Sequence, residues 1–326
     1  MVRLSAAERM ARDLDWNLLR VFLALAESGS VTAAAATLSL KQPSVSSALK
    51  RLETRLGARL IERRPGHFQL TPAGERLRIE AEEVRAAVLR LTDVVADVDG
   101  QASGPVTIAM ASHVISPHFD RVMTDFHRSH PGATFNIEVM ASRDALASVH
   151  ARRASFAISL VSSLPSGVEC EVLYREFFGL YCGPTHPLFG VTGLRLADLS
   201  GMPSVSFQTD QVGDALQPVT EMRRAAQLED RVVGISVNLE EVRWMIWVGM
   251  GIGPLPLHVA DEDVAAGRLW QLPPYDNPAP IDVFLSWNPK KRMNSAEATL
   301  LANLLREIAR VPFAERIYGP IPSAAK

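Results

Sequence analysis

The chain has 326 residues, of which 47% are hydrophobic and 21% charged, a composition typical of a globular protein with room for two or three domains. It has no run of about 18 apolar residues, as a membrane span would need, and its charged first residues lack the apolar segment of a secretory signal. With only two cysteines, a disulfide framework is not implied, and we expect a cytoplasmic protein without a membrane partner.

Charge is distributed unevenly along the chain. The formal net charge is −2, yet residues 41–78 hold nine basic and three acidic side chains, a net of +6 that leaves −8 for the remainder. A basic segment on an otherwise acidic chain favours nucleic acid as a partner. A solvated helical face is the alternative that charge alone leaves open.

Two helices are predicted before this basic segment. Apolar residues at helical spacing indicate an amphipathic helix that ends near residues 28–30, and they are Leu18, Val21, Phe22 and Leu25. Ser30 is suited to cap a second, alanine-rich helix. A short turn at residues 39–41 leads to a third helix, and this helix-turn-helix order is the one that places its second helix in the major groove of DNA.

The third helix, residues 41–57, has two chemically different faces. Pro43 suits its first turn and Gly57 its C-terminal end. One sector is apolar, with Val45, Ala48, Leu49, Leu52 and Leu56, whereas the opposite side carries short hydroxyls and cations. Such side chains can approach a groove, neutralise phosphate or contact bases. We therefore expect contacts with double-stranded DNA from Lys41, Gln42, Pro43, Ser44, Ser46, Ser47, Lys50, Arg51 and Thr54.

A β-wing is predicted next. The segment "LIERRPGHFQLT" reads as two short strands around a turn at residues 65–67. Further DNA contacts are expected there from Arg63, Arg64 and His67. Residues 1–71 are therefore predicted to form a winged helix-turn-helix domain.

These motifs resemble one family. Residues 18–77 are similar to the N-terminal domain of LysR-type transcriptional regulators in the patterns F-x3-AE-SGS, QPSVS, LE-x2-LG, LIER and LTPAG. The resemblance implies a regulator that binds promoter DNA, with RNA polymerase as a further candidate partner. Family members often have Ser or Thr at position 41 and Arg at position 47, so a contact made by that arginine could move here to Lys41 or Lys50.

A long helix is predicted over residues 72–98, because Thr71 is a suitable cap and Pro72 a suitable first residue. Its apolar residues recur at alternating steps of four and three, the spacing of a heptad seam, in Leu77, Ala81, Val84, Val88, Leu91 and Val95. The pattern predicts dimerisation through this helix, and packing along its own effector domain is the alternative. The resemblance implies a dimer or tetramer. Residues 99–104, rich in small and polar side chains, are predicted to form a flexible hinge.

The remaining two thirds alternate between strand and helix patterns, which predicts parallel α/β sheets with helices on both faces. The fold class is therefore α/β: a winged helix-turn-helix, a linker helix and a two-lobed effector domain that resembles periplasmic binding proteins. We expect lobe I at 105–177 with 279–312, lobe II at 178–278 and a tail at 313–326. A solute-binding or transport-associated protein is the alternative function, although it leaves the first 100 residues unexplained.

Ligands of two-lobed α/β domains bind beyond the carboxyl ends of strands, and the residues at such positions are the candidates. Those in lobe I are Ser112, His113, Ser142 and Arg143, and those in lobe II are Ser206, Phe207, Gln208 and Asn238. Helix capping is the alternative role of each serine and of the asparagine, and a backbone hydrogen bond that of the histidine. The resemblance implies a small organic acid or an aromatic metabolite as the effector.

Four weaker motifs do not support an enzyme, a cofactor or a metal. "GMGIGPLP" follows a predicted helix, whereas a dinucleotide loop precedes one. Cys182 and His186 lack a second pair of zinc ligands, and the adjacent Ser112 and His113 are unlike a nucleophile and its base. A redox pair of Cys170 and Cys182 stays open, with two buried thiols as the alternative.

Overall fold

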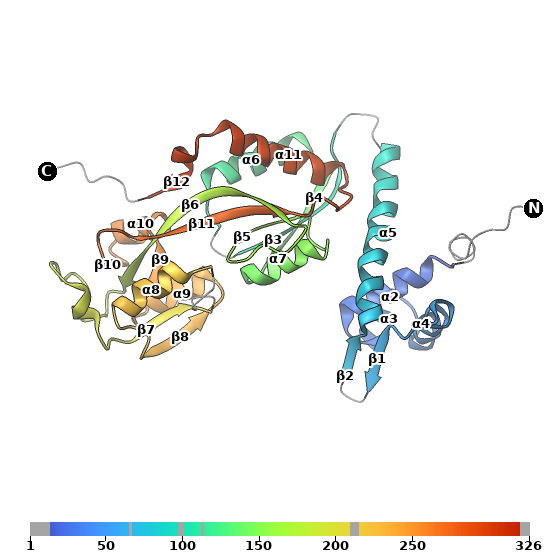
Figure 1. Ribbon diagram of the computed structural model, residues 1–326, viewed down its shortest axis with the longest axis horizontal. Helices are drawn as coiled ribbons and strands as arrows, with labels where there is room; N and C mark the ends of the chain where they lie inside the picture. Colours follow the sequence, from blue (N-terminus) through green and yellow to red (C-terminus); the bar gives the residue numbers. More distant parts are fainter. Residues whose placement is uncertain (1–13, 65–66, 97–100, 112–113, 209–214, 320–326) are drawn as a thin grey trace, which may run out of the picture. The chain divides into compact units, whose positions relative to one another are not determined.

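The computed structural model describes residues 14–64, 67–96, 101–111, 114–208 and 215–319. The side chains of residues 63, 64, 67 and 89–96 lie outside this description. The chain forms two compact units, Met1–Ala96 and Asp97–Lys326, whose elements are labelled in Figure 1.

The first unit is a winged helix-turn-helix followed by a long helix, as predicted. Its elements are α2 (Asn17–Ser28), α3 (Val31–Thr37), α4 (Gln42–Leu56), β1 (Ile61–Arg64), β2 (His67–Leu70) and α5 (Pro72–Ala96). The apolar faces of α2, α3 and α4 form one core, in which Phe22, Leu25 and Leu49 are fully buried. The antiparallel pair of β1 and β2 is the wing.

Capping residues set the bounds of these helices. The Ser30 hydroxyl accepts the N–H of Ala33 at 3.1 Å and begins α3. Gly57 ends α4 with a φ of 65°, a conformation that costs glycine little, and its N–H donates to the carbonyl of Glu53. Both caps agree with the sequence prediction.

The wing joins α5 through a close backbone approach at Gly74. The Thr71 hydroxyl donates to the Arg59 carbonyl at 2.7 Å and accepts the N–H of Gly74 at 3.0 Å. A Cβ at Gly74 would lie 2.1 Å from the carbonyl oxygen of Leu60, so any larger residue would push α5 away. The motif LTPAG is therefore a structural junction.

Helix α5 uses part of its apolar seam within its own unit. Ala81 is buried in the core of the winged helix-turn-helix, and Leu77 and Val84 are half-buried against that core. Arg85 adds an ion pair to Glu27 of α2 at 2.7 Å. These three seam positions therefore pack inside one chain, which differs from the predicted use of the seam by a partner helix.

The second unit is built on a mixed eight-stranded sheet. Its main order is β10–β6–β11–β5–β3–β4, with β9 and β12 also paired to β6. The strands are β3 (Gly104–Met110), β4 (Ala133–Val139), β5 (Phe156–Leu160), β6 (Glu169–Cys182), β9 (Gly253–Pro256), β10 (Trp270–Leu272), β11 (Ala279–Trp287) and β12 (Ile317–Tyr318). Among the strand pairs described for this sheet, only β4–β3, β3–β5 and β12–β6 are parallel. The prediction of a parallel sheet is therefore wrong for β6 and β11, which pair antiparallel.

Helices cover both faces of β3 and β5, as predicted (Figure 1). Large side chains such as Val106 and Ile158 face α6 (Pro117–Ser129) and α11 (Ser295–Arg310). Alanines on the opposite face pack against α7 (Ser142–His150). Large and small residues alternate along these strands, so the face with large side chains packs against α6 and α11 and the face with alanines packs against α7.

A smaller sheet pairs β7 (Ser204–Phe207) with β8 (Val232–Ser236) in parallel. The helices of this part are α8 (Gln217–Ala225), α9 (Leu239–Trp247) and α10 (Leu257–Ala265). Within the described ranges, no helix combines the length and apolar character needed to cross a membrane.

The segment after α11 is ordered. It forms a short 3₁₀ helix, η2 (Phe313–Arg316), and then β12, which pairs with Arg175 and Glu176 of β6. The sequence had suggested only a tail here. Instead, its end adds β12 to the main sheet, next to β6.

Candidate DNA-binding surface and effector region

One face of α4 is fully buried and the other is open. Val45, Leu49 and Leu52 have no exposed surface. Eight of the nine predicted DNA-contact residues of this segment are exposed, and they are Lys41, Gln42, Pro43, Ser44, Ser47, Lys50, Arg51 and Thr54, whereas Ser46 is half-buried. The helical periodicity of the sequence therefore identified the open face.

An open groove runs along that face. It is lined by Leu18, Ser47, Lys50, Arg51, Thr54 and Arg55. Arg55 was missed by the sequence analysis, although it follows Arg51 by one helical turn and lies on the same side. Three cations therefore border one groove beside short hydroxyl side chains.

Two local contacts modify this surface. Arg51 Nη2 lies 3.4 Å from Asp15 Oδ2, and these side chains are 64% and 41% exposed. The Thr54 hydroxyl donates to the Lys50 carbonyl at 2.8 Å, so it can only accept a hydrogen bond from a ligand. A base amino group could fill that role, whereas an ionised phosphate, which only accepts, could not.

The acidic residue of α4 is directed away from the groove. Glu53 Oε1 accepts the N–H groups of Leu60 and Ile61 at 2.9 and 3.4 Å. Its charge therefore serves the start of β1, and the open face of the helix keeps its positive charge.

The predicted contact residues of the wing lie at the turn end of its hairpin. Arg63 pairs with Phe68, and Arg64 with His67, at the end of the hairpin. The predicted DNA contacts of Arg63, Arg64 and His67 depend on side chains that lie outside the described part of the chain.

The predicted effector residues of lobe I are only partly described. Ser142 begins α7 and is 7% exposed, and its hydroxyl accepts the N–H of Leu160 at the end of β5 at 3.2 Å. Arg143 is exposed beside it. Ser112 and His113 lie outside the described residues. Ser142 therefore joins a helix start to a strand end, with one cation nearby.

In lobe II the predicted residues divide into buried and accessible ones. Phe207 is 4% exposed and its ring packs edge-on against Phe178 at 6.1 Å, so its side chain belongs to the core. Ser206 is buried, Gln208 is exposed and Asn238 is half-buried. Asn238 does not cap α9 through its side chain, and its N–H donates to the Ser236 hydroxyl at 3.1 Å. The Phe207 ring therefore packs at the strand–strand junction, and its contact with a ligand stays a prediction.

The structure excludes a redox pair within one chain. Cys170 and Cys182 lie twelve residues apart on the same strand, β6, which corresponds to about 40 Å at 3.3 Å per residue. A disulfide needs Cα atoms within about 7 Å. Burial also raises the pKa of the Cys182 thiol to about 12, which suppresses the reactive thiolate.

The glycines of "GMGIGPLP" turn α9 into β9. Gly249 has a φ of 81°, and a Cβ at Gly251 would lie 2.5 Å from the carbonyl oxygen of Pro203. Among the described residues, no group of three or more His, Cys, Asp or Glu side chains is arranged to hold a metal ion.

These observations define a winged helix-turn-helix protein with an exposed cationic α4, followed by an α/β unit. The family model for bacterial regulatory helix-turn-helix proteins of the lysR family matches residues 16–75. The model for the LysR substrate binding domain matches residues 99–309. The chain therefore belongs to the LysR family and is a DNA-binding transcriptional regulator with an effector-binding domain.

Individual relatives and a solved structure agree with this family assignment. The SDS degradation transcriptional activation protein of Pseudomonas sp. is 29% identical over 264 residues, which cover 78% of this chain and 83% of that protein. The RuBisCO operon transcriptional regulator of Allochromatium vinosum is 25% identical over 294 residues, which cover 90% and 96%. The crystal structure of full-length CbnR complexed with its target DNA superposes with a TM-score of 0.62 at 20% identity, over 91% of this chain and 99% of that one, which shows the fold. The regulator is favoured over the solute-binding alternative.

Proposed function

We propose that α4 enters the major groove of promoter DNA with the face that carries Ser47, Lys50, Arg51, Thr54 and Arg55. The observation that supports this role is the pairing of a fully buried apolar face with an open cationic groove on one helix. Lys and Arg at a groove neutralise phosphates, and short hydroxyls permit close approach to base edges. Lys41 and Ser44, exposed at the start of α4, extend this surface.

The regulator acts as a dimer or tetramer in this proposal, with α5 as the pairing element. Because Leu77, Ala81 and Val84 pack within their own unit, pairing falls to the later seam positions. Val88 is 57% exposed, which leaves it open to a partner helix, while the side chains of Leu91 and Val95 lie outside the described residues. Two copies would present two α4 helices to successive major grooves, which raises affinity.

The α/β unit binds the effector, and we propose a small organic acid or an aromatic metabolite. The exposed cation of Arg143 beside Ser142 supports a carboxylate ligand, because a guanidinium binds carboxylates well. In lobe II, Gln208 and Asn238 remain accessible for polar contacts with the effector. Effector binding would alter DNA binding, and RNA polymerase is the proposed downstream partner in the cytoplasm.

The test is binding to the DNA upstream of the protein's own gene, measured by fluorescence anisotropy between 50 and 200 mM salt, a range chosen from the usual salt dependence of such complexes. The Lys50→Gln/Arg51→Gln variant should bind more weakly, and its log–log salt slope should fall by about 2, roughly one for each lost phosphate contact. The matched control replaces Arg128 and Arg195 by Gln, since both are exposed arginines of the second unit. Equal slopes for wild type and the α4 variant would contradict the proposal.

A further inference from the structure

The start of α6 is held by several distant parts of the second unit. Ser116 caps this helix, with its hydroxyl accepting the N–H of Phe119 at 3.4 Å. The segment Ile115–His118 connects the carboxyl end of β3, where effectors are expected to bind, to the body of the helix. Its contacts come from β6, α10 and the C-terminal segment Phe313–Tyr318.

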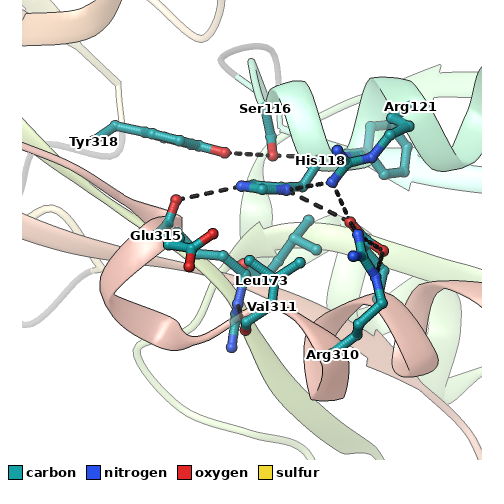
Figure 2. Close-up of polar contacts among 11 residues, drawn as sticks. Ser116, His118, Arg121, Leu173, Arg310, Val311, Glu315 and Tyr318 are labelled. Atoms are coloured by element: carbon teal, nitrogen blue, oxygen red, sulfur yellow. Dashed lines mark hydrogen bonds and ion pairs between the residues drawn. The ribbon is translucent and has the colours of Figure 1, made fainter.

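The C-terminal segment makes two of these contacts. The Tyr318 hydroxyl lies 2.9 Å from the Ser116 hydroxyl. The His118 ring reaches back to η2, with Nε2 3.3 Å from the carbonyl oxygen of Glu315, as Figure 2 shows. The C-terminal segment and the start of α6 therefore contact each other at two points.

His118 contacts two charged side chains through one ring nitrogen. Arg121 Nη2 lies 2.8 Å from His118 Nδ1, and Glu307 Oε1 of α11 lies 3.5 Å from the same nitrogen. Arg121 also pairs with Glu307 of α11, which Arg310 contacts in turn (Figure 2). The ring is therefore oriented from both sides.

Arg316 anchors the C-terminal segment to β6. Arg316 is 6% exposed, and its guanidinium donates to the carbonyls of Val311, Val172 and Leu173 at 3.2, 2.5 and 2.7 Å. Two of these carbonyls belong to β6. Tyr318 is consequently a fixed group and can transmit the position of β6 to α6.

A third contact comes from the other half of the unit. His258, on α10, places Nε2 3.3 Å from the carbonyl oxygen of Ile115, and the Tyr174 hydroxyl hydrogen-bonds the backbone of the same residue. The rings of His258 and Tyr174 lie 5.1 Å each from the Tyr318 ring. Burial lowers the pKa of His258, so the ring is neutral and Nε2–H donates.

We propose that Tyr318, His258 and Tyr174 are positioning residues for effector binding, because together they fix the backbone at the start of α6. Tyr318 and Tyr174 connect this backbone to β6, whereas His258 connects it to α10 of lobe II. A movement of lobe II against β6 would then change the His258 contact while the Tyr318 contact persists. Preorganised backbone of this kind raises ligand affinity by lowering the ordering cost on binding. The functional part of the inference rests on the proposed effector site.

Hydrogen exchange of the full-length protein tests the inference without a ligand. Tyr318→Phe keeps the ring and removes the hydroxyl, and it should speed exchange of amides 115, 116, 118 and 119 about fivefold, the factor expected for one lost hydrogen bond. His258→Phe should act on the same amides. Tyr275→Phe, at a half-exposed tyrosine, is the matched control and should change nothing there. Unchanged exchange in both variants, or equal acceleration throughout α11, would overturn the inference.

Benzoate, an aromatic carboxylate of the proposed effector class, serves as the probe of the binding site. Tyr318→Phe should bind it about fivefold more weakly than wild type, with DNA affinity in the absence of benzoate unchanged. Equal benzoate affinities would overturn the positioning role. Absence of benzoate binding by both proteins would count against the proposed effector class alone, because the exchange measurement decides the inference by itself.

Discussion

Asp15 should weaken DNA binding by competing for Arg51. Its Oδ2 lies 3.4 Å from the Arg51 guanidinium, on the groove that we assign to DNA. Its Oδ1 accepts the N–H of Asn17 at 3.1 Å near the start of α2. Asp15→Asn keeps an oxygen for that hydrogen bond and removes the negative charge, so the electrostatic effect is separated from the helix start.

The magnitude follows from the exposure of the pair. Two unit charges 4 Å apart interact by about 1 kcal/mol in water and about 4 kcal/mol at an effective dielectric constant of 20. Both side chains are more than one third exposed, which places the pair near the lower value, and exposed pairs measure about 0–1 kcal/mol. Asp15→Asn should therefore tighten DNA binding by up to about fivefold and change the free energy of unfolding by less than about 1 kcal/mol.

Fluorescence anisotropy on the upstream DNA measures the gain. Asp125→Asn is the matched control, because Asp125 lies in the second unit, 3.8 Å from Arg128. In the Arg51→Gln background the gain from Asp15→Asn should vanish, because the competition then has no target. A gain that persists without Arg51, or weaker binding by Asp15→Asn alone, would refute this reasoning.

Three further predictions concern packing, assembly and pH. Gly74→Ala should destabilise the first unit by about 2 kcal/mol or more in chemical denaturation, because its Cβ would meet the Leu60 carbonyl at 2.1 Å; an unchanged midpoint would contradict this. Val88→Glu should lower the mass measured by light scattering without lowering the melting temperature, since Val88 is exposed in one chain; an unaltered mass would count against pairing through α5. The hydrogen bond from Arg243, and then that from Arg268, lowers the pKa of Asp263, so its stabilising contribution is present above the ordinary value of 3.8 and is lost as the pH falls through the lowered value. Asp263→Asn should therefore reduce stability at pH 7 more than at pH 2, and an equal loss at both would contradict the assignment.

Local signals predicted the first unit well. The bounds of α4 follow from residues within the helix itself, with Pro43 in its first turn, Gly57 at its end and Val45 and Leu49 on the buried face. Arg55 was missed only because the predicted face was drawn one residue too narrow. The heptad seam of α5 showed that its apolar stripe must pack against another element. Periodicity does not tell which element that is, and Ala81 packs against the core of its own unit.

Contacts between distant parts of the chain could not be read from local patterns. Strand β6 pairs with β11 about one hundred residues later, which gives the antiparallel centre of the sheet. Tyr318 and Ser116 are separated by 202 residues, and a two-residue strand such as β12 has no periodicity. Phe207 follows the rule that strand ends approach ligands, yet its ring is buried because Phe178 lies opposite. In each case the deciding partner lies far away in sequence.

Site-specific crosslinking tests most directly whether the open face of α4 contacts DNA. A photoreactive group on Ser47→Cys, in a Cys170→Ser background that leaves only the buried Cys182, samples the groove, and the same group on Thr124→Cys of α6 is the control. The account predicts crosslinks to bases of the upstream DNA from position 47 and none from position 124. Specific DNA binding without any crosslink from position 47 would contradict it.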